Sequence, residues 1–303
     1  MKKKIAALSM AACMAASVTA CGGSKPAETT AAATEAETTA AESAAEESSA
    51  EETKAAADIE TVTPGKLTVA TSPDFAPYEF YAIGEDGTPK LAGFDMDLAQ
   101  YIADYLGLEL EVVTVDFDGV ISELQTKSVD LGMAGLSPDE KRMGIMDFSD
   151  LYYMGGQSLV TVKDNAEKYN SFEAINKPDV SVGAQVGSIQ MDLANENSPE
   201  ADIVGLPKVT DIISELLTGK MDAAYIETDV AKSYQKNYPE LTLVMDVPYD
   251  AEGSAIGVCK GNEALLAALR SSLLMPASLQ QARNTRVFWT QKETFRINTE
   301  RST

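Results

Sequence analysis

The chain has 303 residues, of which 47 are Asp or Glu and 24 are Lys or Arg, so its formal net charge at pH 7 is −23. This charge argues against nucleic acid or an anionic membrane surface as a partner, because phosphate binding needs a basic patch. The sequence contains no histidine, which excludes Ser-His-Asp and Cys-His catalysis and removes the usual zinc and copper ligand, and we expect no cofactor.

The first twenty residues have the layout of a secretory signal peptide. Three lysines at positions 2–4 precede an uncharged stretch, Ile5–Ala20, that is too short and too weakly apolar to span a membrane. Residues 18–21 (Val-Thr-Ala-Cys) resemble the bacterial lipobox, in which the cysteine is acylated, for example with palmitate. We therefore expect a lipid on Cys21 that anchors the chain to the outer face of the cell membrane. The alternative is an ordinary signal peptide with a chance cysteine near the cleavage site.

Residues 21–58 predict a disordered tether behind that anchor. The segment after Cys21 consists almost entirely of Ala, Glu, Thr and Ser and has no aromatic residue and no Leu, Ile, Val or Met. Such a segment cannot bury enough apolar surface to offset the entropy of ordering. With Cys13 in the signal peptide and Cys21 acylated, only Cys259 remains, so no intrachain disulfide is possible.

The remaining chain alternates between predicted strands and helices in two runs. Periodicity, glycines and strand-like apolar segments place the first run at strand Lys66–Thr71, helix Asp95–Leu106, strand Leu108–Val115, helix Gly119–Lys127 and strand Asp130–Ala134. The second run is strand Val180–Gln185, helix Ser188–Asn195, strand Ile203–Leu206, helix Asp211–Thr218, strand Met221–Ile226, helix Asp229–Gln235 and strand Leu241–Asp246. Such alternation predicts parallel α/β sheets with right-handed crossovers, and two runs predict two lobes.

An internal similarity supports two equivalent units. Val120–Thr126 resembles Ile212–Thr218, and Asp130 and Asp222 follow at the same offset. Duplication and convergence on a stable helix–strand unit both explain it. We predict a first lobe of residues 63–160 and 249–303, a second lobe of residues 161–248, and a hinge of two crossing strands.

Conspicuous residues follow the predicted strands, where ligands bind in open α/β sheets. Several short motifs also resemble, in order, those of family 3 extracellular solute-binding proteins, the polar-amino-acid receptors of ABC importers. They occupy residues 69–80 (VATSPDFAPYEF), 93–99 (GFDMDLA), 117–121, 134–137, 141–142, 147–150, 152–153, 220–224 and 256–261. The resemblance extends from about Lys66 to about Leu269.

This resemblance implies a fold and a function. The fold would be α/β, a two-lobed periplasmic-binding-protein type II fold in which each lobe is a mostly parallel sheet flanked by helices. The protein would be a monomeric lipoprotein, not an enzyme, that captures a free amino acid and delivers it to an ABC permease in the membrane. Two alternatives remain open: an enzyme like cyclohexadienyl dehydratase, and a ligand-sensing domain on the same fold.

The resemblance also assigns polar contacts to the ligand. Arg142 resembles the arginine that grips the α-carboxylate through two parallel hydrogen bonds. Ser188 resembles the residue that adds a hydroxyl and a helix N-terminal N–H to that carboxylate. Glu227 resembles the acid that pairs with the α-ammonium group, with the Gly135 carbonyl and the Ser137 hydroxyl completing that site.

Four further positions would surround the ligand side chain. Phe75 and Phe117 resemble the residues that sandwich it, and Ser72 and Gln185 occupy positions that often tune side-chain choice. Ser72 replaces an aspartate found in family members that bind cationic side chains, which weakens the case for a basic ligand. Ile189 stands where glycine is common in the family.

Each assignment has a plainer alternative. The two phenylalanines could be core aromatics, Arg142 could belong to a solvated helix face, and Glu227 and Ser188 could simply cap helices. We interpret Asp95 and Asp97 as helix N-terminal residues and not as metal ligands. Residues 270–303 contain five arginines and no glycine, which departs from the usual end of the family and suggests a divergent or frame-shifted tail.

Overall fold

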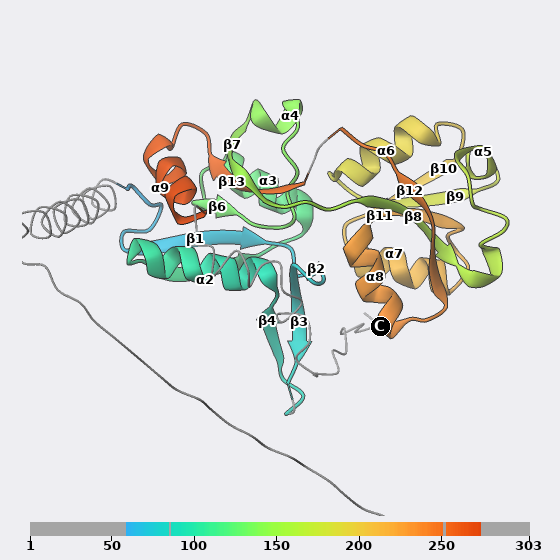
Figure 1. Cartoon of the computed structure of the whole chain (residues 1–303), viewed down its shortest axis with the longest axis horizontal. Coiled ribbons are helices and arrows are strands. Elements are labelled where there is room, and N and C mark those ends of the chain that lie inside the picture. The colour runs from blue at the N-terminus through green and yellow to red at the C-terminus, as the bar shows by residue number, and fades with distance from the viewer. Residues whose placement is uncertain (1–58, 85, 251–252, 274–303) are drawn as a thin grey trace, which may run out of the picture. The chain divides into compact units, whose positions relative to one another are not determined.

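A computed structural model describes residues 59–84, 86–250 and 253–273 (Figure 1). The predictions for the signal peptide, for Cys21, for the tether and for the tail beyond residue 273 lie outside these described residues. Within the described ranges, no helix combines the length and the apolar character that a membrane crossing requires.

The first lobe is built on a five-stranded sheet of order β5-β1-β6-β13-β7. Strand β1 (Lys66–Thr71) pairs in parallel with β5 (Glu109–Thr114) on one side and β6 (Leu131–Gly132) on the other. Strand β13 (Ser254–Cys259) is antiparallel to both β6 and β7 (Met146–Tyr153). Four strands therefore run in one direction and β13 runs in the other.

The second lobe repeats this topology in the order β10-β9-β11-β8-β12. Strands β10 (Asp202–Leu206), β9 (Ser181–Gln185) and β11 (Ala223–Glu227) pair in parallel. Strand β8 (Gln157–Val162) is antiparallel to β11 and to β12 (Leu241–Val247). The sheets are thus mixed, although the sequence predicted parallel pairing, because the reversed strand of each sheet is the one that follows a crossing between the lobes.

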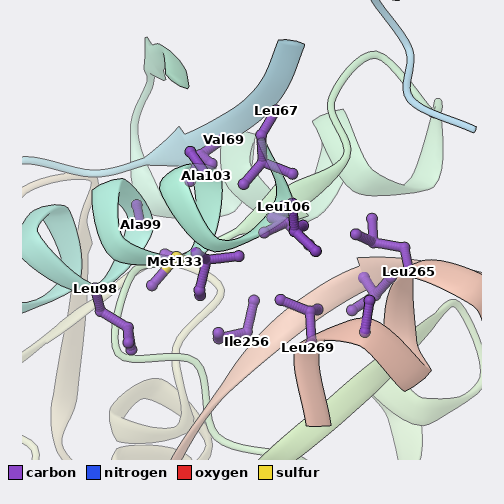
Figure 2. Close-up of a cluster of buried hydrophobic side chains, with 14 of the residues drawn as sticks. Leu67, Val69, Leu98, Ala99, Ala103, Leu106, Met133, Ile256, Leu265 and Leu269 are labelled. Carbon is purple, nitrogen blue, oxygen red and sulfur yellow. The ribbon is translucent and has the colours of Figure 1, made fainter. Parts of the chain in front are cut away.

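Helices cover both faces of the first sheet. Helices α2 (Phe94–Leu106) and α9 (Glu263–Leu273) share one apolar cluster with β1, β6 and β13, and Figure 2 shows its side chains between these elements. Leu67 and Val69 of β1 belong to this cluster, whereas Ala70 faces α3 (Phe117–Gln125) in a second cluster. This alternation is the period of two that a strand buried on both faces requires.

The second sheet is covered in the same way. Helix α6 (Ile189–Asn197) packs on one face with Val182 and Ala184, and helices α7 (Val209–Leu217) and α8 (Thr228–Asn237) pack on the other with Ala224 and Ile226. A short helix α5 (Phe172–Ile175) and a 3₁₀ turn at Lys163–Asn165 lie between β8 and β9.

The internal similarity corresponds to matching local structure. Thr126 and Thr218 end α3 and α7, and their hydroxyls donate to the carbonyls of Ser122 and Ser214 at 2.9 and 2.8 Å. The carboxylates of Asp130 and Asp222 then accept backbone N–H groups of corresponding strands, from Thr68 of β1 at 2.8 Å and from Ser181 of β9 at 2.9 Å. The same helix–strand unit therefore serves both lobes.

The predicted elements of both runs are present, with ends that differ by at most two residues. No element was predicted for two short parts of the fold. One is the small sheet of β2 (Asp74–Phe75), β3 (Glu79–Ile83) and β4 (Pro89–Ala92), and the other is helix α4 (Glu140–Met143). These segments are too short to show a period of their own. The predicted lobe boundary at residue 160 falls inside β8, which pairs within the second sheet.

Candidate functional site

One pocket brings together most of the predicted site residues. Its cavity volume is about 20 Å³ and its wall combines both lobes. Seven of the nine predicted residues line it: Phe75, Phe117, Gly135, Ser137, Arg142, Gln185 and Glu227. Of these residues, Gly135 follows β6, Gln185 ends β9 and Glu227 ends β11, so they lie at strand ends, as the sequence predicted.

Arg142 is a buried cation at the wall of this pocket. Its side chain is held by Asp139, the N-cap of α4, whose carboxylate lies 3.2 Å from Nε. Nη1 donates to the Ser137 carbonyl at 2.8 Å, and Nη2 donates across the lobes to the Gly187 carbonyl at 3.0 Å. These two hydrogen bonds use one N–H of Nη1 and one of Nη2, and Nε faces Asp139 in the ion pair. Since a guanidinium has five N–H donors, the second N–H of each Nη atom remains for a carboxylate. The solvated-helix alternative is wrong, because Arg142 is only 6% exposed.

The Arg142 guanidinium also contacts an aromatic ring of the pocket. Its Cζ lies 5.5 Å from the ring centre of Phe117, the first residue of α3. This cation–π contact contributes roughly 0.5–2 kcal/mol. Together with the hydrogen bonds to the Ser137 and Gly187 carbonyls, this contact holds the cation in place before anything binds.

Glu227 is a buried carboxylate on the second lobe. It ends β11 and caps α8, where Oε2 accepts the Val230 N–H at 2.7 Å, while Oε1 accepts the Tyr78 hydroxyl at 3.3 Å. The capping alternative is therefore correct, and the same carboxylate also lines the pocket. Burial raises the pKa of Glu227 to about 7. A nearby cation would lower this pKa again, which is the electrostatic requirement of an ammonium site.

Two aromatic rings and a glycine shape the apolar part of the wall. Phe75 and Phe117 are 7% and 6% exposed and belong to the cores of the molecule as well as to the pocket. Gly135 has φ +58°, and a Cβ there would lie 2.8 Å from Cε1 of Phe75. The position therefore requires glycine both for its backbone and for the space beside the ring.

Two predicted residues lie outside the pocket wall. Ser188 caps α6 by accepting the Met191 N–H at 3.3 Å, and its hydroxyl donates to the Gln185 carbonyl at 2.7 Å. Ser72 donates to Asp74 at 2.9 Å. Both serines are buried, and each supports a neighbour of the pocket in this structure.

Seven further residues line the pocket and were not predicted as ligand contacts from the sequence. The additional lining residues are Gly155, Gln157, Ile189, Gln190, Tyr249, Gly253 and Ser254. The Gln190 amide donates to the Gln157 amide oxygen at 2.8 Å, and the Tyr249 hydroxyl joins the two crossings by donating to the Gly155 carbonyl at 2.9 Å. The sequence signal that could have indicated a crossing at this point is the glycine pair at residues 155–156, because it separates two apolar segments.

Asp74 was also missed and joins the lobes beside the pocket. Its carboxylate accepts the N–H of Val209 at the start of α7 and the Gln185 amide at 3.3 Å. Its carbonyl accepts the Tyr234 hydroxyl at 2.7 Å. Burial raises the pKa of Asp74 to about 6. A helix N-terminus favours a carboxylate, so these contacts stabilise the approach of the two lobes.

Asp95 has a larger role than the sequence suggested. It lies in the first turn of α2 as expected, but its carboxylate is fully buried and accepts the hydroxyl of Tyr152 at 2.8 Å and the N–H of Gly135 at 3.3 Å. Our interpretation of Asp95 as only a helix N-terminal residue was therefore incomplete.

Fold and site together define a class of protein. Two α/β lobes share one topology, two crossing segments join them, and both lobes contribute side chains to the pocket between them. This arrangement is that of a two-lobed solute-binding protein, with the mixed sheets of the type II fold.

Comparison with known proteins gives the family. The profile described as "Bacterial extracellular solute-binding proteins, family 3" matches residues 67–278. The chain is 35% identical over 202 residues to the "Arginine-binding extracellular protein ArtP" of Bacillus subtilis (strain 168), covering 65% of this chain and 76% of that protein. This chain belongs to the family 3 bacterial extracellular solute-binding proteins.

Two further similarities place the chain among its relatives. It is 29% identical to the cyclohexadienyl dehydratase of Pseudomonas aeruginosa PAO1 over 180 residues, which are 59% of this chain and 66% of that enzyme. Among solved structures, an amino acid ABC transporter substrate-binding protein, AbpA from Streptococcus pneumoniae, bound to L-arginine, matches with a TM-score of 0.68 and 32% identity. That match covers 72% of this chain and 90% of AbpA.

Proposed function

We propose that this protein captures a free amino acid between its lobes and delivers it to the permease of an ABC importer. The observation that carries the proposal is that Arg142 and Glu227, which have opposite charges and belong to different lobes, line the same pocket. A buried guanidinium from one lobe and a buried carboxylate from the other complement the two charges of a zwitterion, and buried charges require such partners. The arginine-binding name of ArtP and the L-arginine bound to AbpA agree with this chemistry.

Capture requires the lobes to separate. The cavity of about 20 Å³ has room for roughly one water molecule, so an amino acid cannot enter without movement. The described residues next to the two crossings between the lobes are 154–156 and 248–250, and bending at these crossings would let the lobes separate. A ligand that contacts both lobes favours the closed arrangement and shifts the population toward it.

A thermal-shift screen tests this proposal. The purified protein is heated with each of the twenty amino acids and with cystine, because a ligand present at one hundred times its Kd stabilises by about 2.7 kcal/mol. We expect one or a few of these compounds to raise the melting temperature. If none of them does, and calorimetry also detects no binding, the protein does not bind amino acids.

An enzymatic function is the second candidate. The similarity to cyclohexadienyl dehydratase and the pKa of Glu227, raised by burial to about 7, would suit a general acid at neutral pH. Incubation with prephenate or arogenate distinguishes the two functions. We expect no turnover, and turnover that depends on Glu227 would replace our proposal. A sensing role would be favoured instead if no permease and ATPase genes adjoin this one.

The lipid anchor on Cys21 belongs to the same proposal. An anchored tether would keep the protein near its permease at a high local concentration. Labelling cells with a palmitate analogue tests the anchor: we expect the wild type to be labelled and to fractionate with membranes. The Cys21→Ala variant should be unlabelled, and labelling that persists in that variant would rule out this site.

A further inference from the structure

Two fully buried acidic side chains lie together behind the pocket. Glu79 of β3 and Asp95 of α2 both have 0% exposure, and their carboxyl groups are within hydrogen-bonding reach of each other. Neither belongs to the pocket wall. Buried carboxyl groups are costly unless they are paired or hydrogen-bonded, so this arrangement requires a physical explanation.

The backbone forces the two groups together. The N–H of Asp95 donates to the Tyr78 carbonyl at 2.8 Å, which holds the start of α2 against β3. Gly93 has φ +129°, and a Cβ there would lie 2.1 Å from the Tyr78 oxygen and 2.9 Å from Cα of Glu79. Only glycine permits this close approach, and the approach brings the two acids into contact.

Three carboxyl oxygens of the pair have no conventional hydrogen-bond donor. Asp95 Oδ2 accepts from Tyr152 and Gly135, but Asp95 Oδ1 and both oxygens of Glu79 have no donor among the described residues. The other charged group that acts on Glu79 is Asp74, which is also acidic, and within the described part of the chain no Lys or Arg acts on either member of the pair. Burying an oxygen without a hydrogen-bond donor is costly, and burying an unpaired charge is more costly still.

We propose that Glu79 is a protonated carboxylic acid that donates its hydrogen to the Asp95 carboxylate. One shared proton satisfies one oxygen of each residue and leaves a single negative charge on the pair. That charge stays on Asp95, because Asp95 already receives the Tyr152 hydroxyl and the Gly135 N–H. Glu79 and Asp95 thereby act as positioning residues for the pocket, and this part of the inference rests on the proposed function.

The surroundings of the pair agree with one proton. Burial, followed by the neighbouring Asp95 and Asp74 charges, raises the pKa of Glu79 well above its ordinary value. Burial also raises the pKa of Asp95, but only to about 6, because its bonds to Tyr152, Gly135 and Glu79 oppose the shift. Both directions agree with a proton on Glu79 and the negative charge on Asp95.

The pair reaches the pocket through Gly135. The Asp95 carboxylate holds the Gly135 N–H, and Gly135 lies against the Phe75 ring in the pocket wall. Tyr152, the other donor to Asp95, comes from β7 shortly before the chain crosses to the second lobe. A negative Asp95 therefore connects β3, α2, β7 and the loop after β6 at one point behind the proposed ligand.

The Glu79→Gln variant tests the shared proton, because glutamine keeps a donor to Asp95 but cannot ionise. In the wild type the folded state keeps its proton above pH 4.5, the ordinary Glu pKa, whereas the unfolded state loses it. The contribution of this group to the free energy of unfolding is therefore fully present below pH 4.5 and decreases as pH rises. We expect the unfolding constant of the wild type, relative to Glu79→Gln, to increase by up to about tenfold per pH unit until the folded pKa is reached.

Two further measurements separate the shared proton from a merely structural contact. Because burial raises the pKa of Glu227 to about 7, Glu227 contributes a protonated-carboxyl band of its own at neutral pH. The infrared spectrum of Glu79→Gln is therefore subtracted from that of the wild type, and the difference should contain a protonated-carboxyl C=O band. For the amino acid that stabilises the wild type most in the screen, we expect Glu79→Gln to bind within about twofold of wild type and Asp95→Asn to bind on the order of tenfold more weakly.

Several results would overturn the inference. Parallel pH profiles for wild type and Glu79→Gln, or absence of the carboxyl band from the infrared difference spectrum, would each show that Glu79 is ionised in the folded protein. Failure of Glu79→Gln to fold would show that an amide donor to Asp95 cannot replace the proposed carboxylic acid. Equal binding by Asp95→Asn would remove the positioning role alone. If no amino acid binds at all, the proposed function fails, while the pH profile and the infrared spectrum still decide the state of the pair.

Discussion

The Arg142→Ala variant tests the ligand site most directly. In the structure the guanidinium donates to the Ser137 and Gly187 carbonyls and its Nε forms an ion pair with Asp139, so the second N–H groups of Nη1 and Nη2 are available to one carboxylate. Removing the guanidinium leaves that carboxylate desolvated and unpaired, which costs about 2–5 kcal/mol. At 1.4 kcal/mol per factor of ten, affinity should fall by roughly 30- to 4,000-fold.

Calorimetry with the amino acid identified by the screen measures this loss, and circular dichroism confirms that the variant folds. Lys141→Ala is the matched control, since Lys141 is the adjacent cation on α4 and its side chain is 78% exposed in a 3.1 Å ion pair with Asp192. That exposed pair contributes at most about 1 kcal/mol. Arg142→Lys keeps the charge without the planar fork and should lie between the two. Unchanged affinity in Arg142→Ala would refute the assignment of the carboxylate site.

Three other predictions follow from the same site. Burial raises the pKa of Glu227 to about 7, and an ammonium ligand needs the ionised carboxylate. Ligand affinity should therefore be constant above pH 7 and should fall by up to about tenfold per pH unit below it. Titration calorimetry at several pH values measures this dependence. Gly135→Ala forces a Cβ to within 2.8 Å of the Phe75 ring at a positive φ, so it should destabilise the fold by at least about 1–2 kcal/mol in thermal denaturation and weaken binding. Asp74→Ala removes the carboxylate that joins the lobes, so it should weaken ligand binding by about 1–3 kcal/mol. It should also increase the radius of gyration of the protein with ligand, as measured by X-ray scattering.

Each of these predictions has a control. Glu227→Gln should have a flat affinity profile below pH 7, and a profile as steep as that of the wild type would assign the titration to another group. Gly87→Ala also has a positive φ but nothing within 4 Å of its Cβ, so an equal effect there would exclude the contact with the ring. Asp116→Ala breaks an exposed 3.9 Å ion pair with Lys208 and should cost less than about 1 kcal/mol. A loss equal to that of Asp74→Ala would contradict the role of burial.

The closed arrangement in this structure depends on polar contacts that are far apart in the chain. Arg142 and Gly187 are 45 residues apart, Asp74 and Gln185 are 111 residues apart, and Tyr78 and Glu227 are 149 residues apart. All three hydrogen bonds join the first lobe to the second. A ligand that contacts Arg142 and Glu227 would therefore act on residues that already take part in closure, which couples binding to the approach of the lobes.

The sequence alone determined the features that depend on local patterns. The period of β1 and α2, the glycine after α2 at position 107, and the repeated helix–strand unit are all local, so the two α/β lobes could be predicted. The rule that ligands bind beyond strand ends, together with the family resemblance, also placed Arg142 and Glu227 at one site before their surroundings were known.

The tertiary structure decided everything that depends on contacts between distant segments. The reversal of β8 and β13 depends on where the chain crosses between lobes, and neither strand shows its direction in its own residues. The Gln157–Gln190 pair and the meeting of Glu79 with Asp95 are contacts formed only by folding. A buried carboxylate and an exposed one have the same letter in a sequence, and only packing decides which of them carries a proton.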